Sequence, residues 1–158
     1  VGCVRGARRK AFRRAVKALG LDGDEAVMAP AAPTDWEQSL AGFVERARDA
    51  ILKHYPDKFA ATAIVCCTEH AALGAYVAAT ARGLRVPDDV SVVGFDDMYG
   101  ATFYPPMTVV SHMLDKIGQK AADIAIDMAE GKGKRQRFRK HYPIEAELVI
   151  RQSTAPPP

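Results

Sequence analysis

Apolar residues recur with helical spacing near the start of the chain and again before its midpoint. The first pattern predicts a helix over residues 5–19, and Gly20 follows it where a helix often ends in glycine. The second predicts a helix that Thr34 or Asp35 caps and that Pro56 ends. Its apolar stripe consists of Leu40, Phe43, Val44, Ala47, Ile51 and Leu52. Between the two helices, the short segment EAVMAP predicts a brief strand that leads into a loop.

The rest of the chain alternates strand patterns with helix patterns. ATAIVCC and VSVVGF are apolar without alternation, which is typical of strands covered on both faces in a parallel sheet. Thr68 is placed to cap the helix between them, which stops at Gly83. MTVVS and AELVIR predict two further strands, separated by a helix that ends at Gly131. The two helices carry apolar stripes at Ala72, Leu73, Tyr76, Ala79 and Thr80, and at Ile117, Ala121, Ile124, Ala125 and Met128.

This order of elements predicts an α/β fold with an open, mostly parallel sheet and helices on both faces. In such sheets ligands bind beyond the carboxyl ends of the strands. Thr68 and Glu69 follow one predicted strand, Asp96 and Asp97 follow the next, and Trp36 lies in the loop region after EAVMAP. We therefore expect these residues to gather along one edge of the sheet.

Composition narrows the class of protein. The 158 residues are 48% hydrophobic and 26% charged, which predicts one globular core. No run of about 18 apolar residues is present and the N-terminus lacks an apolar signal segment, so we expect a cytoplasmic protein that does not enter a membrane. Two basic clusters could contact phosphates, but the first lies on the solvated face of a helix and the second in a connector without a recognition helix, so we do not expect this chain to bind nucleic acid directly. The abrupt start predicts that this chain is part of a longer protein.

The residues at the sheet edge suit a polar, ring-shaped ligand. A carboxylate such as Asp96 accepts hydrogen bonds from neighbouring sugar hydroxyls, and an indole such as Trp36 offers a flat apolar face. Arg8, in the first helix, could add a charged donor. The alternative is that Asp96 and Asp97 only shape a turn, Trp36 belongs to the core and Arg8 is solvated. The residues by themselves leave both interpretations open.

Catalysis and metal binding have little support in the sequence. G-x-S-x-G, Walker A, G-x-G-x-x-G and H-E-x-x-H motifs are absent. Adjacent aspartates on an extended segment point to opposite sides, which disfavours an acid/base pair. No Cys or His stands at C-x₂-C or H-x₃-H spacing. We expect no enzyme, no metal site and no cofactor.

Four stretches of the sequence resemble bacterial transcription regulators of the LacI/GalR family. TAIVCCTEHAALGAYVAATARGLRVPDDVSVVGFDD resembles a strand, an ND-x-x-A-x-G helix, RG-x-x-VP-x-D and SVVGFDD in the family's order. YPPMTVVSHMLDKIGQKAADIAIDMAEG resembles its PPLTTV-x-Q stretch and next helix, and ELVIRQSTAPP resembles its ending ELVVRESTAPP. RGARRKAFRRAVKALGL is similar to an R-x-x-GF helix, more loosely. The resemblance covers nearly the whole chain and is most specific from Arg85 to Asp97.

The resemblance implies a periplasmic-binding-protein-like sensor of type I, in which two α/β subdomains enclose an effector, often a sugar or nucleobase. The sensor would be incomplete here. Residues 1–111 would form the C-terminal subdomain, residues 112–145 a crossover segment and helix that return to a missing N-terminal subdomain, and residues 146–158 the final strand and tail. The last helix would then lack part of its partner surface, and its apolar stripe should pack elsewhere or drive self-association.

The resemblance also implies partners. We expect a small-molecule effector, a homodimer, and operator DNA bound only through a missing N-terminal helix-turn-helix. The alternative is an extracytoplasmic sugar-binding protein of the same fold.

Site residues follow from the resemblance one by one. Asp96 matches the aspartate that contacts effector, and Arg8 matches the arginine four residues before the helix aromatic. Trp36 matches the aromatic that stacks on the ligand, although this chain has one extra residue after it. Asp97 is expected to stay on the other side and shape the turn.

Three of the carried-over positions depart from the family pattern. His112 falls where a glutamine often lies at the subdomain crossover. Thr68 and Glu69 replace the family's Asn-Asp pair. Because threonine lacks the paired donor and acceptor of an amide, the effector need not be a common hexose.

Overall fold

The structure is a computed structural model. It describes residues 7–21, 40–56, 60–131 and 141–157. The predicted strand at EAVMAP, the predicted cap at Thr34 or Asp35, and Trp36 lie outside the described residues.

The described elements alternate as the sequence predicts. In chain order they are α1 (Ala7–Ala18), α2 (Leu40–His54), β1 (Ala63–Val65), α3 (Glu69–Ala81), β2 (Ser91–Asp96), a short 3₁₀ helix (Gly100–Thr102), β3 (Thr108–Ser111), α4 (Leu114–Ala129) and β4 (Glu147–Val149). The sheet has the order β1-β2-β3-β4. The first three strands are parallel, and β4 runs antiparallel to β3. The open, mostly parallel sheet is therefore confirmed.

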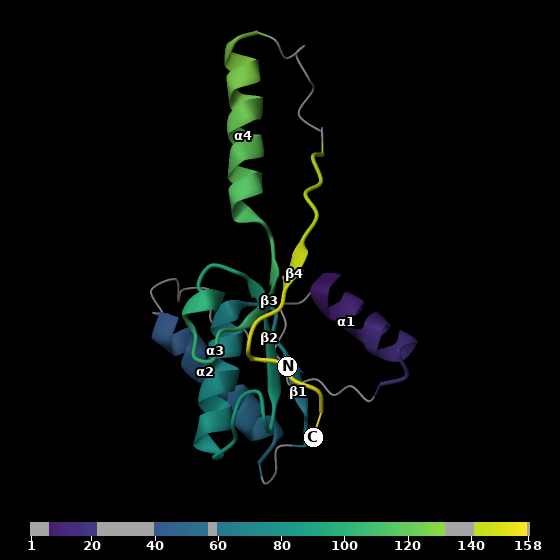
Figure 1. Cartoon of the computed structure of the whole chain (residues 1–158), viewed down its shortest axis with the longest axis vertical. Helices are drawn as coiled ribbons and strands as arrows, with labels where there is room; N and C mark the ends of the chain where they lie inside the picture. Colours follow the sequence, from purple (N-terminus) through teal and green to yellow (C-terminus); the bar gives the residue numbers. More distant parts are fainter. Residues whose placement is uncertain (1–6, 22–39, 57–59, 132–140, 158) are drawn as a thin grey trace.

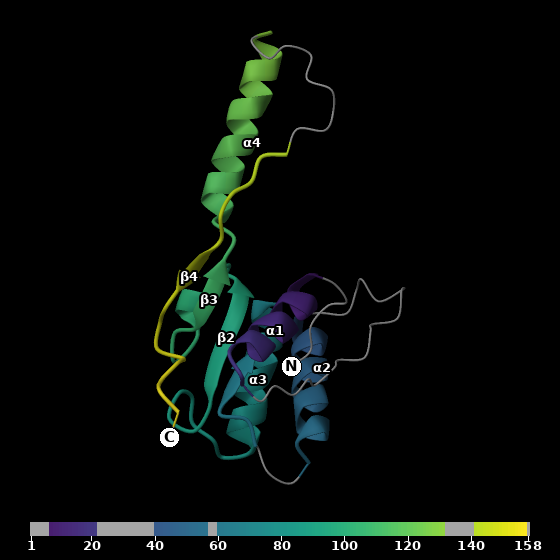
Figure 2. The same ribbon diagram turned by 90° about the vertical axis from the view of Figure 1, so that its right-hand side faces the viewer.

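Helices lie on both faces of this sheet. Figures 1 and 2 show α2 and α3 together on one side and α1 on the other. The main core lies between the sheet and α3. Its fully buried large side chains include Ile51, Ile64, Val92, Met107 and Val109.

Close packing of α2 on α3 depends on a glycine. A Cβ atom on Gly74 would lie 2.5 Å from the Cβ of Ala47 and 2.8 Å from the carbonyl oxygen of Val44. Contacts this short leave no room for any larger residue unless the helices move apart. Gly74 therefore fixes the distance between the two helices.

Local signals set the ends of α3. The Oγ1 of Thr68 accepts a hydrogen bond from the backbone N–H of Ala71 at 3.2 Å, which confirms the predicted N-cap. Gly83 follows the helix with a φ of +69°, a conformation that glycine adopts without steric cost. The helix therefore begins directly at the carboxyl end of β1, next to the sheet edge where ligands are expected.

One expectation about β1 is wrong. ATAIVCC was expected to be covered on both faces, yet Ala63 and Val65 are exposed while Ile64 is fully buried. Successive side chains in a strand point to opposite faces. Ile64 faces the core, whereas α1 reaches the ends of β2 and β3 and does not cover Val65. The apolar run is thus that of a strand with one open face.

Helix α4 projects away from the body of the molecule (Figure 1). None of its residues is buried, and Ile117, Ile126 and Met128 are 41%, 55% and 67% exposed. The apolar stripe of this helix is therefore exposed in the described structure, and its partner surface stays a prediction. Within the described residues, no helix combines the length and hydropathy needed to cross a bilayer.

Candidate functional site

Three polar side chains from separate elements meet beyond the carboxyl ends of the central strands. Arg8 comes from α1, Asp96 ends β2, and His112 follows β3. The Oδ1 atom of Asp96 lies 3.5 Å from Nη2 of Arg8 and 3.3 Å from Nε2 of His112. Nη2 of Arg8 lies 2.8 Å from the same His112 nitrogen. We call these three residues, with Phe95, the Arg8 cluster.

Phe95 supports the cluster from below. The guanidinium of Arg8 stacks over the Phe95 ring at 4.1 Å from the ring centroid. The centroids of the Phe95 and His112 rings are 5.1 Å apart. Nη1 of Arg8 also donates to the backbone carbonyl of Cys67, just before Thr68. The loop between β1 and α3 is thereby attached to the cluster.

The cluster retains unused hydrogen-bonding capacity. Its three polar side chains are 37%, 26% and 35% exposed for Arg8, Asp96 and His112. Both contacts of Asp96 use Oδ1, so within the described residues Oδ2 has no polar partner. Nε2 of His112 can donate to Asp96 or accept from Arg8, but a neutral ring cannot do both. A hydroxyl group, which donates and accepts, suits such a site.

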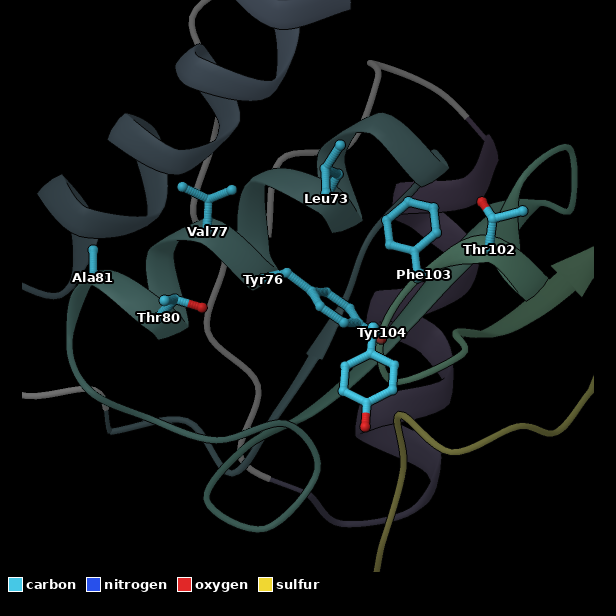
Figure 3. Close-up of a pocket in the computed structure, with 8 residues that line it drawn as sticks. All are labelled: Leu73, Tyr76, Val77, Thr80, Ala81, Thr102, Phe103 and Tyr104. Carbon is cyan, nitrogen blue, oxygen red and sulfur yellow. The ribbon is translucent and has the colours of Figure 1, made fainter.

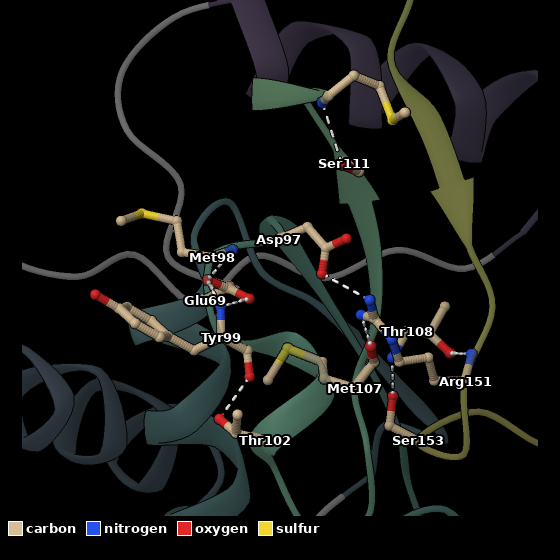
Figure 4. A network of polar contacts seen from close by, with 11 residues as sticks. Glu69, Asp97, Met98, Tyr99, Thr102, Met107, Thr108, Ser111, Arg151 and Ser153 are labelled. Carbon is tan, nitrogen blue, oxygen red and sulfur yellow. Dashed lines mark hydrogen bonds and ion pairs between the residues drawn. The ribbon is translucent and has the colours of Figure 1, made fainter. Parts of the chain in front are cut away.

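The backbone is strained at the same edge of the sheet. Asp96, Asp97 and Met113 have φ values of 97°, 66° and 54°, a region that residues other than glycine rarely occupy. Asp97 turns away from the cluster and pairs with Nη2 of Arg151 at 2.8 Å, while Nη1 of Arg151 donates to the Met107 carbonyl (Figure 4). Strain of this kind persists only where surrounding contacts hold it.

Thr68 and Glu69 do not contact the polar groups of the cluster in the described structure. The hydroxyl of Thr68 caps α3. Glu69 is only 1% exposed, and its carboxylate accepts the backbone N–H groups of Met98 and Tyr99 (Figure 4). Sequence reasoning placed both residues toward the ligand and missed the contact of Glu69 with the turn. The local signal was weak, because a carboxylate in the first turn of a helix is common for dipole reasons alone.

Neither a metal centre nor a reactive thiol is found among the described residues. They contain no group of three or more His, Cys, Asp or Glu side chains that could hold a metal ion. Cys66 is a free, buried cysteine, and burial raises the pKa of its thiol to about 12. The thiol is therefore protonated at neutral pH and is a poor nucleophile.

A second surface feature lies between α3 and residues 102–104. An apolar groove of about 660 Å³ is lined mainly by Leu73, Tyr76, Val77, Thr80, Phe103 and Tyr104 (Figure 3). The Tyr76 hydroxyl donates to the Pro105 carbonyl at 2.9 Å, whereas Tyr104 is 94% exposed. Sequence reasoning did not single out this groove, although two adjacent prolines beside an aromatic residue mark an exposed turn.

Comparison with known proteins identifies the fold family. Residues 3–154 match the periplasmic binding protein-like domain. The chain is 38% identical over 93 residues to the transcriptional repressor PurR of Haemophilus influenzae. The aligned segment covers 58% of this chain and 28% of the repressor. The chain thus spans less than a third of this curated relative.

Solved structures extend the match over almost the whole chain. A LacI-family regulator from an Arthrobacter species, crystallised with lactose, superposes with a TM-score of 0.73 at 23% identity, over 98% of this chain and 52% of that one. A LacI-family regulator from Silicibacter pomeroyi superposes with a TM-score of 0.67 at 26% identity, over 94% of this chain and 50% of that one. A complex of the transcriptional regulator CelR with cellobiose superposes with a TM-score of 0.64 at 27% identity, over 92% of this chain and 41% of that one.

The family match, the mostly parallel sheet and the strand-end cluster agree with one another. The chain therefore belongs to the periplasmic-binding-protein-like domain family, in the form found in LacI-family transcriptional regulators, and it covers part of that domain.

Proposed function

We propose that the chain is the effector-sensing and dimerisation part of a bacterial LacI/GalR-type transcriptional regulator in the cytoplasm. In this proposal the Arg8 cluster forms one wall of a cleft for a small polar effector, sugar-like or nucleobase-like. Residues 112–145 lead to a second subdomain that supplies the other wall, and residues 146–158 return from it. A separate helix-turn-helix binds operator DNA. We call the protein with all these parts the complete regulator.

The observation that carries the proposal is the free acceptor in the Arg8 cluster. Oδ2 of Asp96 has no polar partner among the described residues, and Arg8 and His112 stand beside it as donors. Their combined formal charge is zero with a neutral histidine, which favours an uncharged ligand over an anion. Structures of related regulators contain lactose and cellobiose, which are uncharged and rich in hydroxyls.

The position of His112 offers a way to couple binding to motion. His112 lies between β3 and α4, and the next residue, Met113, has a left-handed backbone at the start of α4. An effector that contacts His112 would bias the path of this connection. A ligand shifts an equilibrium only by its difference in affinity for the two states, so closure of the two subdomains must improve these contacts.

A thermal-shift screen of the complete regulator tests the proposal. Lactose, cellobiose, ribose, adenine and guanine are suitable probes, and a ligand at 100 times its dissociation constant stabilises the folded state by about 2.7 kcal/mol. We expect at least one sugar or base to raise the melting temperature and to change operator binding. An exported sugar-binding protein, the alternative, would respond to a sugar without binding operator DNA.

We further propose that the apolar groove beside α3 is the homodimer surface. The lining residues Leu73, Tyr76, Val77, Phe103 and Tyr104 carry no formal charge, so a second copy can pack against the same patch without burying an unpaired charge. The high exposure of Tyr104 fits an aromatic anchor that a partner would cover.

Replacing Val77 by glutamate should weaken this dimer. Val77 is 37% exposed on the groove, and dimerisation would bury the new carboxylates without partners. We expect the dimer dissociation constant to rise at least about tenfold, which corresponds to about 1.4 kcal/mol. Sedimentation equilibrium measures it, with Leu19→Glu as the control because Leu19 is 71% exposed on the chain segment after α1. An unchanged dimer in the Val77 variant would place the interface elsewhere.

A further inference from the structure

Among the described residues, Glu69 is the one buried acidic side chain, and the proposed function does not use it. Its side chain is 1% exposed, whereas Asp96 and Asp97 keep 26% and 18% exposed side chains. A buried carboxylate is costly unless hydrogen bonds satisfy it. Such a group therefore needs a structural or functional reason.

The partners of Glu69 are backbone N–H groups of the turn that follows Asp97. The N–H of Met98 donates to Oε2 at 2.8 Å, and the N–H of Tyr99 reaches Oε1 and Oε2 at 3.0 Å each. Figure 4 shows the carboxylate between the backbone nitrogens of Met98 and Tyr99. Hydrogen bonds to an ionised acceptor are about twice as strong as neutral ones.

The turn that Glu69 holds is also the strained one. Asp96 and Asp97 both have positive φ, and residues other than glycine keep such a conformation only where surrounding contacts hold it. From the other side, Arg151 pairs with Asp97 at 2.8 Å. The turn is therefore held on two sides: Glu69 binds the N–H groups of Met98 and Tyr99, and Arg151 binds the side chain of Asp97.

The backbone at Gly100 lies close to both Glu69 and Arg151. A Cβ atom on Gly100 would lie 2.6 Å from Nη1 of Arg151 and 3.1 Å from Oε1 of Glu69. A methyl group there would first meet the terminal atoms of the Arg151 side chain and then the Asp97 and Glu69 carboxylates. This closeness links the position of the turn to both Glu69 and Arg151.

We propose that Glu69 is a positioning residue for Asp96: by binding the N–H groups of Met98 and Tyr99, it holds the turn so that the Asp96 carboxylate faces Arg8 and His112. Its relevance to effector recognition rests on the proposed function. Burial and full engagement of its oxygens remove Glu69 from direct contact with a ligand. It acts through the backbone instead.

Glu69→Gln tests this proposal without any ligand. Glutamine has nearly the same shape, but it presents an N–H₂ group to one of the backbone donors. In the complete regulator we expect hydrogen exchange at Met98 and Tyr99 to become at least about tenfold faster. We also expect the His112 ring signals in ¹H–¹³C NMR to move as they do in Asp96→Ala, because Asp96 leaves the His112 ring. Glu45→Gln, on the exposed face of α2, is the matched control and should change neither readout.

The double variant separates positioning from general destabilisation. If Glu69 acts through Asp96, adding Glu69→Gln to Asp96→Ala should move the His112 signals no further. Faster exchange at Met98 and Tyr99 with unchanged His112 signals would overturn the proposal, and so would unchanged exchange. If Glu69→Gln does not fold, Gly100→Ala adds a methyl group 3.1 Å from Oε1 of Glu69 and should shift the His112 signals in the same direction. None of these readouts uses an effector, so the result of this test does not depend on whether the effector screen succeeds.

Discussion

Replacing Asp96 by alanine should lower the effector affinity of the complete regulator by about 100-fold, while the protein remains folded. The variant removes the free Oδ2 acceptor and also leaves Arg8 and His112 without their shared anion. A hydrogen bond to a charged group contributes roughly 1.5–3 kcal/mol, and each 1.4 kcal/mol is tenfold in affinity. Isothermal titration calorimetry with a ligand from the screen measures the change.

Asp88→Ala is the matched control for this variant. Asp88 lies before the start of β2, whereas Asp96 ends that strand, and the ion pair of Asp88 with Arg85 is solvent-exposed. Exposed pairs of this kind contribute about 0–1 kcal/mol, so neither stability nor affinity should change measurably. Unchanged affinity in Asp96→Ala would remove Asp96 from the binding site.

The second large effect is expected at Gly74. Gly74→Ala should lower the free energy of unfolding of the 158-residue chain by about 3 kcal/mol, because overpacking of a closely packed contact typically costs 1–3 kcal/mol. The new methyl group would meet the Cβ of Ala47 and the carbonyl oxygen of Val44 at 2.5 and 2.8 Å. The backbone of α2 cannot yield as a flexible side chain would. Denaturant unfolding measures the difference.

Gly118→Ala provides the comparison. Gly118 lies in α4, and a Cβ atom there would have no neighbour within 4 Å. Alanine favours a helix over glycine by about 1 kcal/mol, so this variant should be neutral or stabilising. A loss of stability at Gly118 equal to that at Gly74 would show that close packing of α2 on α3 is not the cause.

Much of the fold could be predicted because its signals are local. The caps and stops of α3, at Thr68 and Gly83, depend on residues next to the helix. The open face of β1 could not be predicted, because an apolar run does not reveal which neighbours cover it. Val65 is apolar and exposed, and only the placement of α1 explains this.

Only part of the candidate site, likewise, could be predicted from the sequence. Strand and helix alternation places Asp96 at the sheet edge, but Arg8 and His112 are 104 residues apart, and the family resemblance was needed to bring them together. The contact between Glu69 and Met98 joins residues 29 apart through a backbone N–H group. A donor of that kind is present in every residue except proline, so no residue pattern records it.

Hydrogen exchange of the complete regulator, with and without the sugar or base that stabilises it, tests the central claim most directly. If the Arg8 cluster is a wall of the effector cleft, residues 95–99 and 111–113 should exchange more slowly when the effector is bound. Protection confined to the groove around Tyr76 and Tyr104, or absent from both segments of the cluster, would contradict this account.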